Sequence, residues 1–563
     1  MAIGAPSPTG VGMLLLGVVV LVLGRRFRGY FAGAPYVQLA TGLLRENKPD
    51  AAVDVVASLG AKASSAGPVR RGVALVRANA ALLEGHAALA EREASSALEG
   101  ATQLFFEGAE LQQRARALGV RALARVAQGN LDGATADAAA VVLAAEAEPH
   151  ALAEARLAEA LVLVRRADTP ALAQHLDRHA GLLLEHCPPR ERAVVRALRR
   201  LVHARKTSVY REPAQREARV ASGGRLTEWA GTFAPDLAEF VVEEATTPVV
   251  PPPFAPGPSP AATLFGKPDR SAARVLGLWG ALIVMFLAIW QFLTPAERVP
   301  PPPRDEAAER ARAAEEEQTS STLFSLQMGA AVLVFASLVV LMVRKQRHAD
   351  RELAAGRRAL ATGDEATGER RLESVAKTSR LWLRTNGPYA ALAGVELARL
   401  AERRGDFVGA LDRCEAALVA LDRTAGGRRG ASDFVLPTVL CERAVALAGM
   451  GKVDTSALAL GQLRVEIPDF HDLPTAVVRA RLVGDVVRGD WASAAEAARM
   501  RTSEMPLPLR EDLLADVVLA ANGVLAKDER ERIAAELASH TEAAAWIDRL
   551  APGLRASVTG APS

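Results

Sequence analysis

The sequence is poor in cysteine and in aromatic residues. Only three cysteines occur, Cys187, Cys414 and Cys441, and none belongs to a CxxC pair. This spacing argues against a disulfide framework or a thiolate metal site and favours reduced thiols in a cytosolic compartment. Phe, Trp and Tyr make up only 4% of the chain, although 50% of it is hydrophobic. The apolar content is therefore mostly Ala, Val and Leu, which predicts an all-α fold of closely packed helices.

The sequence also lacks a strong excess of charge of either sign. Its formal net charge is +3 at pH 7, which is too small over 563 residues to argue for a nucleic-acid partner. Lysine is rare, with 8 residues against 60 arginines. This bias is typical of a GC-rich genome and indicates a bacterial source.

Charged residues are absent from two long apolar runs. One covers 275–293 and the other 323–343. At about 1.5 Å of helical rise per residue, each run matches roughly the 30 Å of hydrocarbon in a bilayer. Backbone amide and carbonyl groups find no water to bond in lipid. An uncharged run of this length is therefore expected to form a helix, which bonds these groups internally. We therefore predict a transmembrane hairpin at 275–293 and 323–343, joined by a short exported loop at 294–322.

A shorter apolar run lies near the N-terminus. It covers 11–24 and is followed by Arg25, Arg26 and Arg28. A cleavable signal peptide carries its positive charges before the apolar run, so this order favours an uncleaved transmembrane anchor within 1–28. Fourteen residues are short for a span, so the bilayer would have to thin around this helix.

Basic clusters flank all three predicted spans. They follow the first span, precede the second at Lys267, Arg270 and Arg274, and follow the third from Arg344. The positive-inside rule places these clusters in the cytoplasm. The expected protein is a multi-pass protein of the bacterial inner membrane with two cytoplasmic arms, while its N-terminus and 294–322 lie outside.

The two arms, 29–247 and 344–563, are rich in helix pairs separated by short turns. The best example covers 397–418, where an amphipathic helix ends at Gly405-Asp406 and a second helix begins. Small residues on both sides of the turn allow the helices to approach closely. The unit resembles the tetratricopeptide repeat, a family of helix-turn-helix units of about 34 residues that stack into superhelices. The small residues of that family correspond here to Ala398, Ala410 and Ala417.

Further copies are expected at the turns near Asn47, Gly85, Gly129, Asp168, Gly363, Gly451 and Gly489. Together they predict two α-solenoid arms of roughly four units each. Because alanine is common throughout the chain, irregular helical bundles are the alternative. A proline-rich spacer at 248–274 separates the first arm from the hairpin, since so much proline blocks both helix and central strand.

Groups that could carry chemistry are sparse. His175 and His179 lie four residues apart and could share a metal ion, but the glutamate of an HExxH motif is missing. No nucleophile motif and no phosphate-binding glycine loop is recognisable. The sequence therefore predicts no enzyme, no cofactor and no bound metal, with surface histidines as the interpretation of the pair.

The segment from Arg190 to Arg225 contains eleven Lys and Arg residues and three acids. A solvated helix face is the first interpretation, and contact with anionic lipid headgroups is the second. Nucleic acid is a distant third, because only Tyr210 could stack on bases.

The concave surface of proteins resembling the tetratricopeptide repeat usually binds peptide segments or partner proteins. The resemblance implies a membrane-anchored scaffold or adaptor, with groove positions at Leu392, Val395, Arg399, Glu402, Arg403 and Arg479. The alternative is a non-catalytic subunit of a bacterial envelope or transport complex that assembles through its transmembrane helices. Gly329 and Gly280 are among the small residues that would favour such packing.

Overall fold

The computed structural model describes most of both arms. The described residues are 33–34, 36–44, 48–59, 67–99, 107–144, 147–206, 225–241, 341, 344–378, 387–423, 435–467, 470, 472–501, 505, 507–525 and 527–559. The predicted spans at 11–24, 275–293 and 323–343, apart from residue 341, lie outside them, as do the proline-rich spacer and the exported loop. Among the helices of the described residues, none combines the length and the apolar character that a bilayer crossing requires.

The first arm is a series of helices joined by short turns. Its first half contains α2 (Pro49–Ala57), α4 (Gly67–Leu83), α5 (Ala87–Leu98), α6 (Glu107–Ala127) and α7 (Leu131–Leu143). Its second half contains α8 (Pro149–Arg165), α9 (Thr169–His186), α10 (Pro189–Lys206), α12 (Arg225–Phe233) and α13 (Pro235–Ala238). A further helical segment covers 36–44.

The second arm is also a series of helices joined by short turns. A helix over 344–361 leads into α17 (Glu365–Thr378), α18 (Gly387–Arg403), α19 (Phe407–Asp422), α20 (Val435–Gly449) and α21 (Val453–Glu466). The arm ends with α22 (Leu473–Arg488), α23 (Trp491–Arg499), α24 (Leu509–Ala521), α25 (Lys527–Ser539), α26 (Thr541–Leu550) and α27 (Leu554–Thr559). The described residues are helices and connecting turns without a strand, so the all-α prediction is confirmed for this part of the chain.

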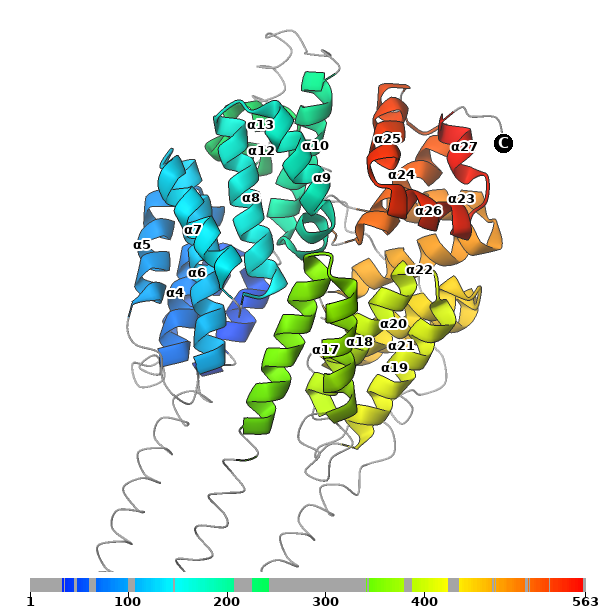
Figure 1. Cartoon of the computed structure of the whole chain (residues 1–563), viewed down its shortest axis with the longest axis horizontal. Coiled ribbons are helices and arrows are strands. Elements are labelled where there is room, and N and C mark those ends of the chain that lie inside the picture. Colours follow the sequence, from blue (N-terminus) through cyan, green and yellow to red (C-terminus); the bar gives the residue numbers. More distant parts are fainter. Residues whose placement is uncertain are drawn as a thin grey trace, which may run out of the picture.

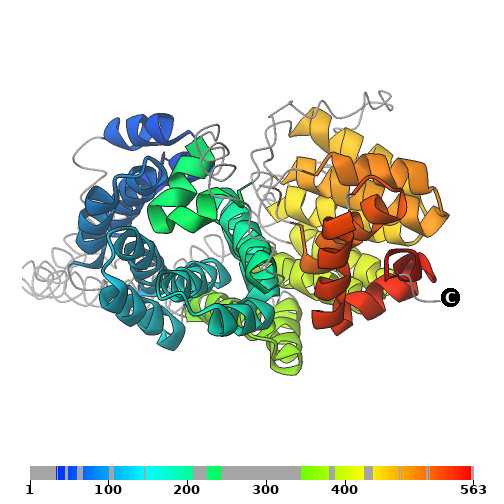
Figure 2. The ribbon, with the colours of Figure 1, turned by 90° about the horizontal axis from the view of Figure 1, so that it is seen from above.

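Helices stack in chain order in both arms. Each of α4, α6, α18, α20 and α22 contacts the next helix and also the next but one. Figure 1 shows the two arms side by side, and Figure 2 shows the first arm curving as an arc of helices. Contact of each unit with its neighbours is the pattern of an α-solenoid, so the helical, repeat-like architecture is consistent with that prediction.

The turns within helix pairs share one hydrogen-bonding pattern. At Gly405 the backbone has φ +77°, the Gly405 amide donates to the Glu402 carbonyl, and the Asp406 amide donates to the Ala401 carbonyl. This is a Schellman motif, in which a left-handed residue ends one helix. The Asp406 side chain then accepts a 2.8 Å hydrogen bond from the Gly409 amide and caps the next helix. The same left-handed conformation occurs at Gly85, Gly129, Ala167, Gly363, Gly451, Gly489 and Gly523.

Small residues fill the contact between paired helices, as the sequence predicts. Ala398 and Ala410 are fully buried on the two sides of the Gly405 turn. A Cβ atom on Gly394 would lie only 3.0 Å from the Cβ atom of Ala417, so α18 and α19 approach too closely there for a larger side chain. The equivalent small residues after other turns are also buried: Ala52, Ala90, Ala134, Ala138, Ala173, Gly368, Ser456, Ala494 and Ala498.

The last two helices of the first arm fold back against earlier ones. Nε1 of Trp229 donates a 2.7 Å hydrogen bond to the Leu82 carbonyl at the end of α4. Phe233 is buried, its ring meets that of Trp229 edge to face, and its carbonyl accepts a hydrogen bond from Arg165 of α8. In Figure 2, α12 and α13 lie inside the arc that α4 to α10 form. The first arm therefore already holds a short helical segment of its own chain on its inner side.

One of the left-handed turn positions is occupied by an alanine instead of a glycine. Ala167 is exposed and has φ +56°, where a Cβ atom is unfavourable. We expect Ala167→Gly to raise the free energy of unfolding of the first arm by about 0.5 to 1 kcal/mol. Urea titration followed by circular dichroism measures this change. Gly129→Ala, at a left-handed residue in the preceding turn, should instead lower the free energy of unfolding by a similar amount. Changes of the same sign for the two substitutions would contradict the left-handed conformation of Ala167.

Candidate binding cavity between the arms

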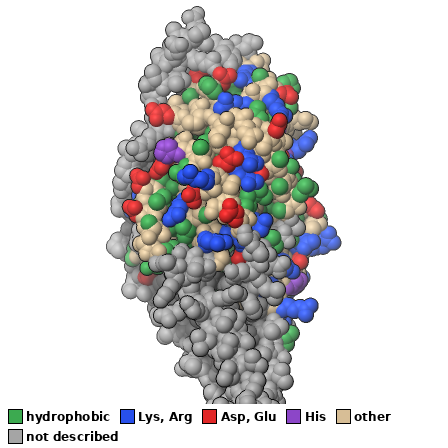
Figure 3. Space-filling model, turned by 90° about the vertical axis from the view of Figure 1, so that its left-hand side faces the viewer, with side chains coloured by type: hydrophobic (Ala, Val, Ile, Leu, Met, Phe, Trp, Pro, Cys, Tyr) green, Lys and Arg blue, Asp and Glu red, His purple; other side chains and the backbone are tan. Residues whose placement is uncertain are grey.

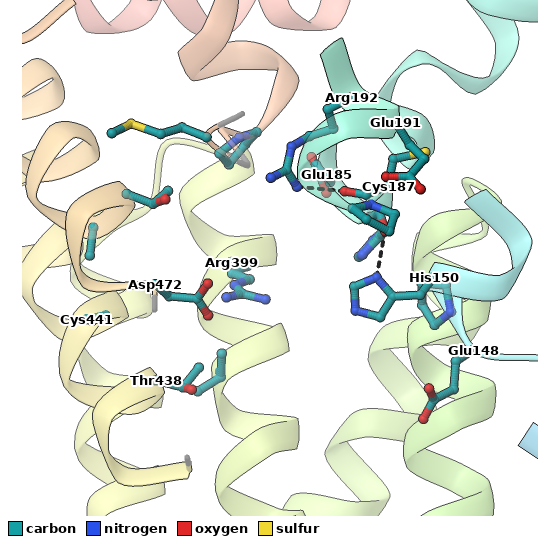
Figure 4. Close-up of a pocket in the computed structure, with 18 of the residues that line it drawn as sticks. Glu148, His150, Glu185, Cys187, Glu191, Arg192, Arg399, Thr438, Cys441 and Asp472 are labelled. Atoms are coloured by element: carbon teal, nitrogen blue, oxygen red, sulfur yellow. Dashed lines mark hydrogen bonds between the residues drawn. The ribbon is translucent and has the colours of Figure 1, made fainter. Parts of the chain in front are cut away.

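A cavity of about 1030 Å³ opens between the two arms. The first arm contributes residues of α6, α8, α9 and α10, and the second contributes residues of α18, α20, α22 and α24. Figure 4 shows the two walls facing each other, with Glu148 and His150 on one side and Thr438, Cys441 and Asp472 on the other. This volume lies at the upper end of the range for ligand pockets, roughly 300 to 1,000 Å³.

All six predicted groove residues line this cavity. Leu392, Val395, Arg399, Glu402 and Arg403 come from α18, and Arg479 comes from α22. The structure thus brings together positions that are up to 87 residues apart in the sequence, Leu392 and Arg479. The sequence did not predict the opposite wall, which belongs to the first arm.

Arg479 is the centre of a buried charge network. Its guanidinium lies 3.0 Å from a carboxylate oxygen of Glu402, 2.9 Å from one of Glu442 and 2.7 Å from one of Glu511. All four side chains are at most 7% exposed. They come from α18, α20, α22 and α24, which are the first helices of four successive pairs. One guanidinium therefore ties together the inner helices of the second arm.

The carboxyl groups of this network differ in their ionisation. Burial opposes the charged form of Glu442, but the guanidinium groups of Arg399 and Arg479 outweigh it and lower the pKa of Glu442 to about 2. Burial, reinforced by the neighbouring Glu442 and Glu511, raises the pKa of Glu402 well above its usual value. Burial also raises the pKa of Glu511, in spite of the contact with Arg479. The network therefore contains more carboxyl groups than its cations can hold in the charged form.

The first-arm wall contains two further buried carboxyl groups. Burial raises the pKa of Glu154 to about 8, and the nearby Glu191 adds to this effect while Arg116 opposes it. Burial raises the pKa of Glu191 as well. Burial also raises the pKa of the Cys187 thiol well above its usual value, so this thiol is a poor nucleophile near neutral pH.

The histidines in and near the cavity wall make contacts within the protein. Nδ1 of His150 lies 2.6 Å from the His186 carbonyl oxygen and donates to it. Burial lowers the pKa of His186 to about 4. The His175 and His179 rings lie 4.8 Å apart, and Nε2 of His175 bonds the Arg156 carbonyl at 2.8 Å, so that nitrogen is not free to bind a metal. Within the described residues, no group of three or more His, Cys, Asp or Glu side chains could hold a metal ion.

Ion pairs join the two arms, and one of these pairs lines the cavity. Arg196 of α10 lies 3.0 Å from the Asp512 carboxylate, and Arg199 lies 2.5 Å from that of Glu536. Arg403 lies 2.5 Å from the Glu185 carboxylate. In addition, Arg358 donates hydrogen bonds to two backbone carbonyls at the end of α7, those of Val142 and Ala144.

The basic segment from Arg190 to Arg225 is described only up to 206 and at its last residue. All six arginines of α10 contact other groups of the chain. Arg190 and Arg192 are buried and donate to the backbone carbonyls of Leu83 and Cys187. In this helix the arginines join parts of the protein to one another, which neither of the leading sequence interpretations anticipated.

Charges of both signs are mixed on the part of the first arm that faces the viewer in Figure 3. In Figure 3, Lys and Arg side chains alternate with Asp and Glu over the face that the view presents. Such a mixture lacks the basic stripe that binds nucleic acid.

Searches against models of protein families, against curated proteins and against solved structures yield no match to this chain. The arrangement of its own residues is thus the basis for any functional proposal.

Removing the central guanidinium should cost much of the stability of the second arm. We expect Arg479→Met to lower the free energy of unfolding by about 3 to 5 kcal/mol, because it leaves the buried Glu402 and Glu511 without their cation and Glu442 with Arg399 alone. Arg443→Met is the matched control, since Arg443 pairs with the half-exposed Glu415 at the surface, and it should cost less than about 1 kcal/mol. Urea titration of the two variants measures both changes, and equal losses would contradict the role of Arg479.

The buried Glu154 should make stability depend on pH. Its pKa is about 8 in the folded chain against 4.5 in the unfolded chain, so the folded state retains a proton that the unfolded state loses. The contribution of this group to the free energy of unfolding therefore falls as the pH rises from about 4.5 to about 8. At pH 7 the loss relative to pH 4.5 is roughly 3 kcal/mol. Glu154→Gln removes this penalty.

The melting temperature of Glu154→Gln should accordingly rise above that of the wild type as the pH increases from 5 to 8. Glu415→Gln, at an exposed carboxylate, is the control and should follow the wild type at every pH. If the difference in melting temperature between Glu154→Gln and the wild type does not change with pH, Glu154 is ionised in the folded protein.

Proposed function

We propose that the protein is a membrane-anchored scaffold or adaptor whose cavity between the arms binds segments of partner proteins. The observation that carries this proposal is the cavity of about 1030 Å³, lined by both arms and by all six groove positions. Stacked helix pairs present an extended inner surface of the kind that binds peptides. We further propose that the arms are divergent relatives of the tetratricopeptide repeat.

The first arm supports this proposal with a bound segment of its own. The α12 and α13 helices lie against its inner side through the buried Trp229, Phe233 and Leu237. Trp229 also donates to a backbone carbonyl of α4. Apolar anchors combined with a few directed hydrogen bonds are how a groove holds an amphipathic helix.

The membrane attachment is part of the same proposal. The helix over 344–361 begins directly after the predicted span at 323–343, so the second arm would be held close to the bilayer. Reduced, buried Cys187, Cys414 and Cys441 suit arms that face the cytoplasm. We place the protein in the bacterial inner membrane, with residues 294–322 outside and with anionic lipid contact as a further role for the basic residues beyond α10.

The second candidate is a non-catalytic subunit of an envelope or transport complex. The small residues Gly329 and Gly280 of the predicted spans favour this alternative, because they permit close helix contact in a bilayer. The two candidates differ in which surface meets the partners. In the scaffold it is the cavity, and in the subunit it is the predicted spans.

Site-specific photo-crosslinking of the full-length chain in native membranes tests the scaffold. A photoreactive residue replaces Leu392, which lines the cavity, or Val408, which is exposed on α19 away from it. We expect discrete crosslinked proteins from position 392 that are absent from position 408. The additional variant Val395→Trp, which narrows the cavity, should reduce these products several-fold. Crosslinks from a probe at Gly329 together with none from position 392 would instead support the envelope-complex subunit.

A further inference from the structure

A short segment at 225–241, here named the inner segment, lies on the inner side of the first arm without belonging to its stack of helices (Figure 2). The helices from α4 to α10 contact one another in chain order, so the stack is continuous without it. The inner segment contains α12 and α13, which are nine and four residues long, with the extended Ala234 between them. Helices shorter than about 12 residues are marginal in water by themselves. The inner segment therefore owes its helical form to the arm, whereas the contacts of the stack do not run through it.

Three apolar side chains anchor the inner segment. Trp229 and Phe233 lie four residues apart on α12, and Leu237 follows on α13. All three are at most 3% exposed and belong to the same hydrophobic cluster as Leu82 and Leu161 of the stack. Nε1 of Trp229 also donates a hydrogen bond to the Leu82 carbonyl. Residues four apart share one face of a helix, so this is the way in which an amphipathic helix binds to a larger surface.

Two arginines of the stack bind backbone groups of the inner segment. Arg165 of α8 donates to the carbonyls of Thr232 and Phe233. These carbonyls lie at the end of α12, where a helix leaves such groups without an internal partner. Arg200 of α10 donates to the Phe240 carbonyl at 3.2 Å. Every sequence carries backbone carbonyls, so these contacts select a helical form more than one particular sequence.

Two further arginines contact side chains of the inner segment. Arg205 of α10 lies 2.8 Å from the Asp236 carboxylate. The guanidinium of Arg190 lies over the Trp229 ring, 5.9 Å from its centroid, which is a favourable position for a cation. The inner segment contains three acids and one arginine. Its net negative charge is therefore complementary to the arginines that surround it.

The position of Trp229 adjoins the cavity between the arms. Leu83 and Arg190 line that cavity. Arg190 also covers the Trp229 ring and donates a 2.7 Å hydrogen bond to the Leu83 carbonyl. The neighbouring Leu82 carbonyl is the one that Trp229 bonds. A protein segment in the cavity would therefore lie next to the first anchor of the inner segment.

We propose that the inner segment is an internal ligand, and that a helix of a partner protein replaces it on the first arm. The partner helix has two aromatic residues four positions apart and an acidic residue that takes the place of Asp236 beside Arg205. The inner segment blocks this site while it is bound, so the first arm is autoinhibited. This inference rests on the proposed function, because it names the chemistry of a partner segment and the regulation of its access.

A labelled synthetic peptide with the sequence of 225–241 tests the proposal on the full-length chain in detergent. In the chain, Trp229→Ala combined with Phe233→Ala removes two internal anchors and opens the site. We expect fluorescence anisotropy to show about tenfold or more tighter binding of the peptide to this double variant than to the wild type, because the internal competitor is weakened. Glu228→Gln, at an exposed residue of α12, is the control and should bind the peptide as the wild type does. Equal binding to all three chains would overturn the proposal.

Circular dichroism of the double variant separates an internal ligand from a structural part of the arm. Its helical signal should fall by no more than α12 and α13 themselves contribute. A larger loss would show that the stack requires the inner segment, and the proposal would then fail.

A second variant keeps all anchors and locks the inner segment in place. A Cβ atom on Gly85 would lie 4.0 Å from Cγ2 of Thr232, so Gly85→Cys and Thr232→Cys can be joined by a short bismaleimide. The joined chain should bind the peptide about tenfold more weakly than the same chain before joining. Unchanged binding after joining would contradict an overlap between the peptide site and the inner segment.

A double-mutant cycle locates the charge contact. In the opened chain, Arg205→Gln should weaken binding of the peptide about threefold, and Asp236→Asn in the peptide should have the same effect. The two changes together should cost no more than either alone, because they remove one interaction. Additive losses would overturn the role of Arg205 in recognising an acidic residue.

Two other results would assign the site differently. A dimer of the wild-type chain that Trp229→Ala with Phe233→Ala abolishes would assign the site to the inner segment of a second copy and overturn the separate partner. If the peptide fails to bind while position 392 still crosslinks to proteins, the internal ligand is wrong but the scaffold remains.

Discussion

The second arm depends on one buried guanidinium. Arg479 meets Glu402, Glu442 and Glu511, and all four side chains are at most 7% exposed. Withdrawing these charges from water is costly, and their mutual attraction offsets that cost only when the geometry is maintained. The four helices that carry them must therefore keep one register along the inner side of the arm. A repeat stack held only by alanine and leucine contacts would allow small slips that this network penalises.

The same constraint explains the polar character of the cavity. With three carboxyl groups around Arg479 and only Arg399 to assist it, Glu402 cannot be satisfied as an ion, and burial raises its pKa. Glu154 and Glu191 on the opposite wall are in a similar situation. An acid-rich interior of this kind is unfavourable for stability. Such a cost is often retained at a binding site, where a ligand compensates for it.

Charge pairs join the two arms. Arg196 and Arg199 of α10 reach Asp512 and Glu536 across the junction. Arg403 adds a pair beside the cavity. Guanidinium groups suit this task because several donors in a plane fix direction as well as distance.

The sequence by itself determined the local structure. Glycine followed by Asp or Asn ends one helix and caps the next through contacts within a few residues, so the turns near Gly129, Gly363, Gly405 and Gly489 were predictable. The turns at Gly523 and Gly553 were missed, although Asn522-Gly523 and Pro552-Gly553 are turn-forming pairs. The resemblance to the tetratricopeptide repeat implied groove positions at Leu392, Val395 and Arg399, and these residues do line the cavity.

The contacts between residues of distant helices could not be derived from the sequence in this way. The arginines of α10 suggested a surface in contact with water or lipid, yet they join helices and arms. Glu154, Glu191 and Glu511 carry no motif, and a lone glutamate in an apolar helix, such as Glu442 in 435–449, is only a weak signal of a buried pair. Their roles follow from contacts between helices that are distant in the chain. Local sequence determines where a helix begins, ends and turns its apolar face, but only the tertiary structure decides which charges meet once water is excluded.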